Sequence, residues 1–108
     1  MNYVIKERSS GGVIASGETI CTLEGGWYFR PDQVNMEVLR VTERTYTCPY
    51  KGVCHWVDLE SPRGRAQNVA WIYANPKSGY EMIKGLVGFN SSDTAGTLAQ
   101  IIRSTQHA

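Results

Sequence analysis

Two runs rich in β-branched and aromatic residues occupy the middle of the chain, and a short polar loop separates them. The first run covers residues 53–59 and the second covers residues 68–73. The loop between them, Ser61-Pro62-Arg63-Gly64-Arg65, contains the proline and glycine that are typical of turns. This pattern predicts two antiparallel strands joined as a hairpin.

Shorter runs of the same kind precede this hairpin. Residues 12–16 and 19–24 flank a Gly17-Glu18 turn, and this spacing predicts a second hairpin. The aromatic run Trp27-Tyr28-Phe29 lies between a glycine pair and Pro31, so we expect a bulged strand or a loop there. These segments are all too short and too interrupted for long helices.

Further strands are expected on either side of a proline-glycine break. Residues 45–47 and 86–89 each read as a short strand. Pro49 has no N–H to donate to a neighbouring strand, so we expect Tyr50-Lys51-Gly52 to form an exposed corner.

Helical spacing occurs in three places. Residues 31–39 predict one or two turns of helix after Pro31, and residues 80–84 predict a single turn. In the tail, residues 91–108, Ser92 or Asp93 is placed to cap a helix from residue 94 to 103. Leu98, Ile101 and Ile102 would share one side of it and would dock on the sheet or on a second copy. The predicted fold class is mainly β with small helices.

The overall composition narrows the possible functions. A chain of 108 residues fits one domain, 1–108, with 42% apolar and 19% charged residues. The net charge of +1 offers no footprint for nucleic acid. No apolar run approaches the roughly 18 residues of a membrane span, and the N-terminus lacks the pattern of a signal peptide. These features predict a cytoplasmic protein with no membrane and no nucleic acid among its partners.

The three cysteines favour reduced thiols over a disulfide framework. Cys48 lies near Arg44, Lys51 and His55, and cationic neighbours can lower a thiol pKa. Cys48 can therefore be read as a nucleophile or redox thiol, or as a small buried residue at a strand end.

A metal site is not expected. Strand alternation sends Cys54 and His55 to opposite faces, and the gap between Cys48 and Cys54 does not match a zinc knuckle. A fourth ligand would have to come from His107 in the tail. The glycine pairs also lack the spacing of a phosphate loop, so no cofactor is expected.

Two groups of side chains suggest a ligand pocket. Lys51 and Arg44 could hold a carboxylate or phosphate, although Lys51 could equally be a solvated turn residue and Arg44 could be paired with Glu43 or Asp58. The aromatic residues could line a pocket or simply fill the core, and alternation places two of them, Trp71 and Tyr73, on one face. The aromatic set is Trp27, Tyr28, Trp56, Trp71 and Tyr73.

Four blocks of the sequence are specific enough to indicate a family. They are EGGWYFRP at 24–31, TCPYKG at 47–52, VAWIY at 69–73 followed by Pro76, and IKGLVGF at 83–89. Together they resemble domain-of-unknown-function family 427 over about residues 12–90. The resemblance implies a small two-sheet antiparallel β domain, similar to the tent-like Mss4 group. Several members of that group bind zinc, but this chain lacks their paired CxxC motifs. The family implies no settled activity.

Three functional hypotheses follow. The first is a pocket that binds a small anionic or planar molecule through Arg44, Thr47, Tyr50, Lys51, Trp56, Trp71 and Tyr73. The second is an enzyme in which Cys48 is the nucleophile or redox thiol and His55 or Lys51 carries a proton or stabilises charge. The third is an interaction module that forms a homodimer through the tail.

Overall fold

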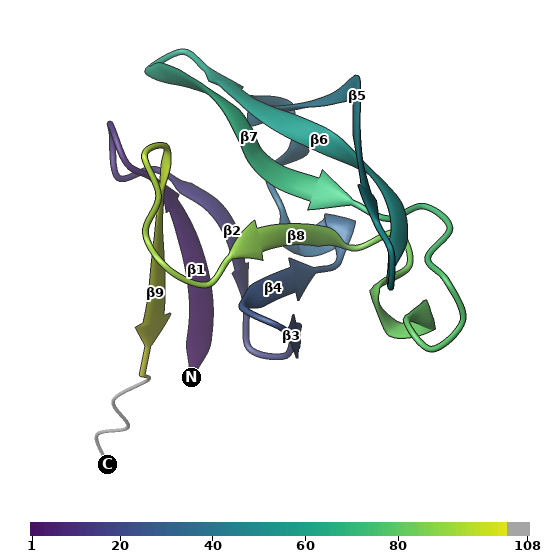
Figure 1. Ribbon diagram of the computed structural model, residues 1–108. Coiled ribbons are helices and arrows are strands. Elements are labelled where there is room, and N and C mark those ends of the chain that lie inside the picture. The colour runs from purple at the N-terminus through teal and green to yellow at the C-terminus, as the bar shows by residue number, and fades with distance from the viewer. Residues whose placement is uncertain (104–108) are drawn as a thin grey trace.

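The computed structural model describes residues 1–103, and nearly all of its regular structure is β (Figure 1). The helical segments within these residues are single 3₁₀ turns: η1 (Pro31–Gln33), η2 (Met36–Val38) and η3 (Glu81–Ile83). The strands are β1 (Asn2–Glu7), β2 (Val13–Gly17), β3 (Cys21–Leu23), β4 (Gly26–Phe29), β5 (Leu39–Cys48), β6 (Gly52–Ser61), β7 (Gly64–Ile72), β8 (Val87–Asn90) and β9 (Thr97–Ile102). The predicted mainly β fold class is confirmed.

The strands form two antiparallel sheets. The smaller sheet has the order β2-β1-β9, and the larger has the order β3-β4-β8-β7-β6-β5. Figure 1 shows the smaller sheet on one side and the long strands β5, β6 and β7 arching over the short strands β4 and β8. Register shifts interrupt the β5–β6 and β6–β7 pairings, and bulges of this kind bend and twist a sheet.

The main core lies between the two sheets. Ile5 and Ile14 come from the smaller sheet and meet the rings of Phe29 and Phe89 from the larger one, all at most 1% exposed. Successive strand residues point to opposite faces, so Trp27 and Phe29 enter this core while Tyr28 points away from it.

A second apolar cluster occupies the opposite face of the larger sheet. Its buried members are Tyr28, Cys54, Tyr73 and Ile83. Tyr28 and Cys54 come from strands β4 and β6, whereas η3 supplies Ile83 from the loop after β7. The larger sheet is therefore buried on both faces along part of its width, and this second face carries the site described below.

The central hairpin is confirmed as β6–β7, but the predicted hairpin of residues 12–16 with 19–24 is wrong. β2 pairs with β1 in one sheet, and β3 pairs with β4 in the other. β3 and β4 are joined by Glu24 and Gly25, which have φ values of 49° and 77°. Two consecutive positive φ values form the tight turn that suits a hairpin, so the chain reverses there and not at Gly17.

The predicted helix over residues 94–103 is also wrong. Residues 97–102 form β9, which pairs with β1 along its whole length, from Asn2 opposite Ile102 to Glu7 opposite Thr97. Thr97, Ile101 and Ile102 are β-branched and fit a strand better than a helix. The loop before β9 is fixed by Asp93, whose Oδ1 accepts the amide of Ala99 at 3.0 Å. Residues 104–108 of the predicted tail lie outside the described residues.

The short helical predictions are confirmed in reduced form. Residues 31–39 contain η1 and η2, and residues 80–84 contain η3. None of the helices within residues 1–103 is long and apolar enough to cross a membrane.

Candidate functional site

The turn between β5 and β6 presents Lys51 toward the second face of the larger sheet. The predicted corner is present, but only Tyr50 is exposed, whereas Lys51 is partly buried and Gly52 is buried. Gly52 closes this turn with a φ of 106°, a conformation that favours glycine. The segment after β7 braces the turn twice: the Lys77 amide donates to the Lys51 carbonyl at 2.8 Å, and Lys77 Nζ donates to the Pro49 carbonyl at 2.9 Å. These contacts fix the backbone that carries Lys51.

Lys51 reaches across the sheet to Glu24. Its Nζ lies 2.6 Å from Glu24 Oε1 and 6.0 Å from the centroid of the Tyr80 ring. The Lys51 side chain is only 14% exposed, whereas that of Glu24 is 53% exposed. The hydrogen bond that Lys51 donates to Glu24 raises the pKa of Lys51 above its ordinary value, so the amine stays protonated. Because β3 and β5 are the two edge strands, this ion pair joins turns at opposite edges of the sheet.

Tyr28, Gly88 and Trp71 form the floor beneath this ion pair. Gly88 is paired with both Tyr28 and Trp71 across adjacent strands, and the two aromatic side chains close over it. Trp71 Nε1 donates to Tyr28 Oη at 3.0 Å, and the two rings are nearly perpendicular, with centroids 6.1 Å apart. A Cβ at position 88 would lie 2.6 Å from Trp71 Nε1 and 2.7 Å from Tyr28 Cε2, so this contact requires glycine.

Above this floor lies a cavity of about 490 Å³. Its walls are mainly aromatic: Trp56 packs edge-on against Trp71 with ring centroids 6.3 Å apart, and Tyr46 lies 6.1 Å from Trp56. The lining tyrosines, the Asn68 and Asn90 side chains and the Lys51–Glu24 pair supply its polar groups. The full lining consists of Glu24, Gly25, Gly26, Tyr28, Tyr46, Lys51, Cys54, Trp56, Asn68, Trp71, Tyr73 and Asn90.

Cys48 and Cys54 have different surroundings, although both belong to the second apolar cluster. The backbone amides of Lys51 and Tyr50 hydrogen-bond to Cys48 and lower its pKa. Burial raises the pKa of Cys54, which lines the cavity beside Tyr73. Burial also raises the pKa of Tyr73.

Within residues 1–103, no three His, Cys, Asp or Glu side chains are placed to hold a metal ion. His107, considered above as a ligand, lies outside the described residues.

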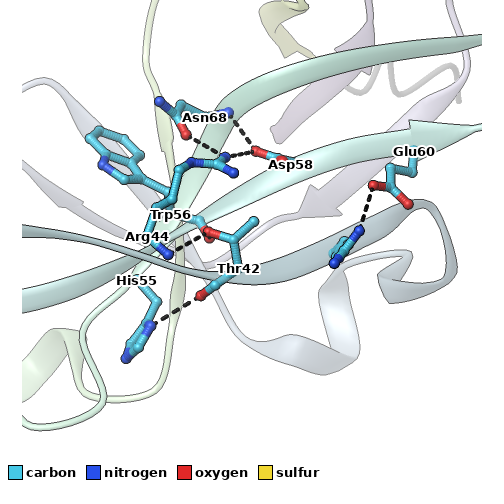
Figure 2. A network of polar contacts seen from close by, with 8 residues as sticks. Thr42, Arg44, His55, Trp56, Asp58, Glu60 and Asn68 are labelled. Carbon is cyan, nitrogen blue, oxygen red and sulfur yellow. Dashed lines mark hydrogen bonds and ion pairs between the residues drawn. The ribbon is translucent and has the colours of Figure 1, made fainter.

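Arg44 lies beside the cavity and is held by two partners (Figure 2). Its guanidinium forms an ion pair with the buried Asp58 and donates to Asn68 Oδ1 at 2.9 Å. The backbone N–H of Asn68 in turn donates to Asp58 Oδ1 at 2.9 Å, at a position where Asn68 has a φ of 56°. Of these three residues, Asn68 lines the cavity. Arg44 therefore has the Asp58 partner that the sequence left open as an alternative.

Three other candidates from the sequence lie away from the cavity lining. His55 is exposed, and its Nδ1 lies 3.1 Å from the carbonyl of Thr42 (Figure 2). Tyr50 is 72% exposed at the tip of the turn, and Thr47 is exposed on β5. The structure thus brings Lys51, Trp56, Trp71 and Tyr73 to one cavity and leaves Arg44, Thr47, Cys48, Tyr50 and His55 outside its lining.

The lining also includes residues that were not selected as site residues from the sequence, notably Glu24, Tyr46, Asn68 and Asn90. Glu24 precedes a glycine pair, and Gly-Gly is a turn signal that would place Glu24 near the tip of a hairpin. Asn68 takes a positive φ, which asparagine tolerates better than most residues. No local sequence pattern predicts that Glu24 or Asn68 lines this cavity.

The fold and the cavity define a small, mainly β protein with an aromatic-lined pocket on one face of its larger sheet. The chain belongs to the family described as a domain of unknown function (DUF427), whose match covers residues 11–100. This range includes every residue that lines the cavity. No curated protein matches the chain in sequence.

Proposed function

We propose that the protein binds a small molecule that combines a flat ring with an anionic group, in the cavity between Lys51 and Trp71. The observation that carries this proposal is the Lys51 ammonium, which is held at 14% exposure above an aromatic floor. A lysine is normally solvated, and one kept beside a cavity by a carboxylate is preorganised to meet a negative group.

The size and lining of the cavity support this proposal. A volume of about 490 Å³ lies within the range of small-molecule sites, and five aromatic side chains and several polar groups line it. Trp56 and Trp71 are nearly perpendicular, so a flat ring could stack on one and meet the edge of the other. Asn68 and Asn90 add amide groups that could fix its orientation.

In this proposal Lys51 provides charge and does not act as a nucleophile, because its raised pKa keeps the amine protonated. Arg44 contributes indirectly by holding Asn68, and we leave Thr47 and Tyr50 out of the binding set.

Binding can be tested with 8-anilinonaphthalene-1-sulfonate, a fluorescent molecule with flat rings and one negative charge. We expect saturable binding that Lys51→Gln weakens about tenfold, since a hydrogen bond to a charged group contributes roughly 1.5–3 kcal/mol. The matched control is Lys84→Gln, an exposed lysine outside the cavity, which should bind the probe as the parent protein does. Thermal unfolding of each variant checks that the fold is intact.

The proposal would be overturned by a folded Lys51→Gln variant that binds the probe with unchanged affinity. Trp71→Leu provides a second check, because losing one wall of the cavity should also weaken binding.

Thiol chemistry at Cys48 is a second candidate function, favoured by the turn amides that lower the pKa of this thiol. His55, its proposed proton carrier, makes its contact with the Thr42 carbonyl, so Lys51 is the better placed partner. The rate at which Cys48 is alkylated as a function of pH tests this candidate.

A further inference from the structure

The charges of the cavity are balanced. Lys51 and Glu24 are the two residues with formal charges among those that line it within residues 1–103. They face each other at 2.6 Å, so the cavity has one positive and one negative group and no net charge. A ligand that carries only a negative charge is attracted by Lys51 but is also repelled by the Glu24 carboxylate beside it.

The contact between Lys51 and Glu24 leaves each side chain with unused hydrogen-bonding capacity for a ligand. The ion pair uses Oε1 of Glu24, and the Glu24 side chain is 53% exposed, so its second oxygen can accept a donor. An ammonium group has three donors, and Lys51 uses one of them toward Glu24. A ligand could therefore bind both charges without breaking the pair.

We propose that the ligand is a zwitterion, a flat aromatic ring carrying adjacent ammonium and carboxylate groups as in an aromatic α-amino acid. This inference rests on the proposed binding function and specifies its ligand class. The ligand carboxylate accepts from Lys51, and its ammonium donates to Glu24, so that four alternating charges form a closed arrangement. Each charge then lies beside opposite charges, which a pure anion or a pure cation cannot achieve.

The aromatic walls suit the remainder of such a ligand. Trp71 is nearly perpendicular to both Trp56 and Tyr28, with interplanar angles of 83° and 81°. The ring centroids of Trp56 and Tyr28 lie 6.3 Å and 6.1 Å from that of Trp71, and the three rings provide both faces and edges for a guest ring. The lining glycines, Gly25 and Gly26, lie next to Glu24 and add no side chains of their own to the lining.

Three molecules that share a phenyl ring and differ in charge test the inference by calorimetric titration. They are L-phenylalanine, 3-phenylpropionate, which lacks the ammonium, and phenethylamine, which lacks the carboxylate. We expect L-phenylalanine to bind at least about tenfold more tightly than either of the others, because each lost group removes a charge-assisted contact. In Glu24→Gln this advantage over 3-phenylpropionate should fall severalfold, whereas Glu18→Gln, an exposed acidic residue outside the cavity, should retain it.

Two results would contradict the proposal of a zwitterionic ligand without contradicting the proposed binding function. One is tighter binding of 3-phenylpropionate than of L-phenylalanine, together with a gain in its affinity in Glu24→Gln, which would make Glu24 a competing anion. The other is failure of all three molecules to bind when the naphthalene sulfonate probe binds in a Lys51-dependent way. Loss of that Lys51 dependence would instead remove the proposed function itself.

Discussion

Gly88 shows how a single residue determines the shape of the cavity floor. The Trp71 indole and the Tyr28 ring occupy the space above it, where any Cβ would come within 2.7 Å of both. The hydrogen bond between Trp71 and Tyr28 satisfies the indole N–H where the rings close over Gly88. A glycine in the middle of a strand normally weakens it, and here it is required by the close approach of two aromatic side chains.

Also at the residue scale, Cys48 and Cys54 should differ in reactivity. Turn amides lower the pKa of Cys48, and burial raises that of Cys54, which is 1% exposed. We therefore expect iodoacetamide to modify Cys48 at least about tenfold faster than Cys54, since the thiolate is the reactive form. The Cys48 rate should reach half its maximum below the ordinary thiol pKa of 9.0.

Mass spectrometry of peptides from the native protein, alkylated over a range of pH, measures both rates, and alkylation after denaturation is the control. Equal rates for the two thiols, or a Cys48 midpoint above the ordinary value, would contradict the prediction and remove the support for thiol chemistry.

Sequence reasoning selected four of the cavity residues because their signals are local. Strand alternation placed Trp71 and Tyr73 on one face, and the proline-glycine break placed Lys51 on a corner. Glu24 was not selected, because its partner Lys51 lies on a different hairpin at the other edge of the sheet. The pairing depends on how far the sheet curves, and local sequence patterns do not encode that distance.

At the scale of elements, the buried carboxylate of Glu7 ties β1 to the turn between β6 and β7. Glu7 is 5% exposed, and its Oε1 accepts from Ser61 Oγ at 2.6 Å and from Ser9 Oγ at 3.1 Å. Gly64 allows this approach, since a Cβ there would lie 2.8 Å from the same oxygen. The contact connects the two sheets at one end of the core.

We expect Glu7→Gln to lower the free energy of unfolding by about 1–3 kcal/mol at neutral pH, because hydrogen bonds to a buried charged group are among the stronger ones. The Ser61 hydrogen bond holds the pKa of Glu7 below its ordinary value of 4.5. A carboxyl group whose pKa is lower in the folded chain than in the unfolded chain stabilises the fold at a pH above its pKa in the unfolded chain. This stabilisation is lost as the pH falls through the pKa of the group in the folded chain. The difference between variant and parent should therefore shrink in acid.

Urea unfolding at neutral and acid pH measures this difference, with Glu37→Gln, an exposed acidic residue, as the control. A Glu7→Gln penalty that is the same at both pH values would show that the carboxylate charge is not involved.

Some of the predicted strands and helices are confirmed and others are wrong. The β6–β7 hairpin was found because two long β-rich runs flank a short proline-glycine loop. The proposed pairing of residues 12–16 with 19–24 failed because Gly17 and Gly25 both resemble turns, and local patterns do not say which of them reverses the chain. The helix expected over residues 94–103 failed because a short segment with few apolar residues, here Leu98, Ile101 and Ile102, does not separate helix from strand by its spacing.

At the scale of the whole molecule, β9 closes the smaller sheet by pairing with the N-terminal strand β1. Thr97 is 1% exposed in this pairing, while Ile101 and Ile102 remain about half exposed. Self-association through these residues stays a prediction.

Truncation after Gly96 should therefore destabilise the protein by several kcal/mol or prevent folding, because it leaves β1 unpaired on one side and opens the core. Urea unfolding followed by tryptophan fluorescence measures the loss. Ile101→Thr is the matched control, since it keeps the strand and changes an exposed side chain, and it should shift stability by no more than about 0.5 kcal/mol. A truncated chain as stable as the full chain would mean that β9 is dispensable.

Local patterns were sufficient for the mainly β class, the central hairpin, the corner that carries Lys51 and the faces of Trp71 and Tyr73. These features depend on side-chain alternation and on the backbone preferences of proline and glycine, which act within a few residues. Strand partners, the closing role of β9, the glycine beneath the aromatic floor and the Lys51–Glu24 pair emerged only in the folded chain. Each of these depends on contacts between segments far apart in sequence, which are selected by burial of the whole core and not by any local preference.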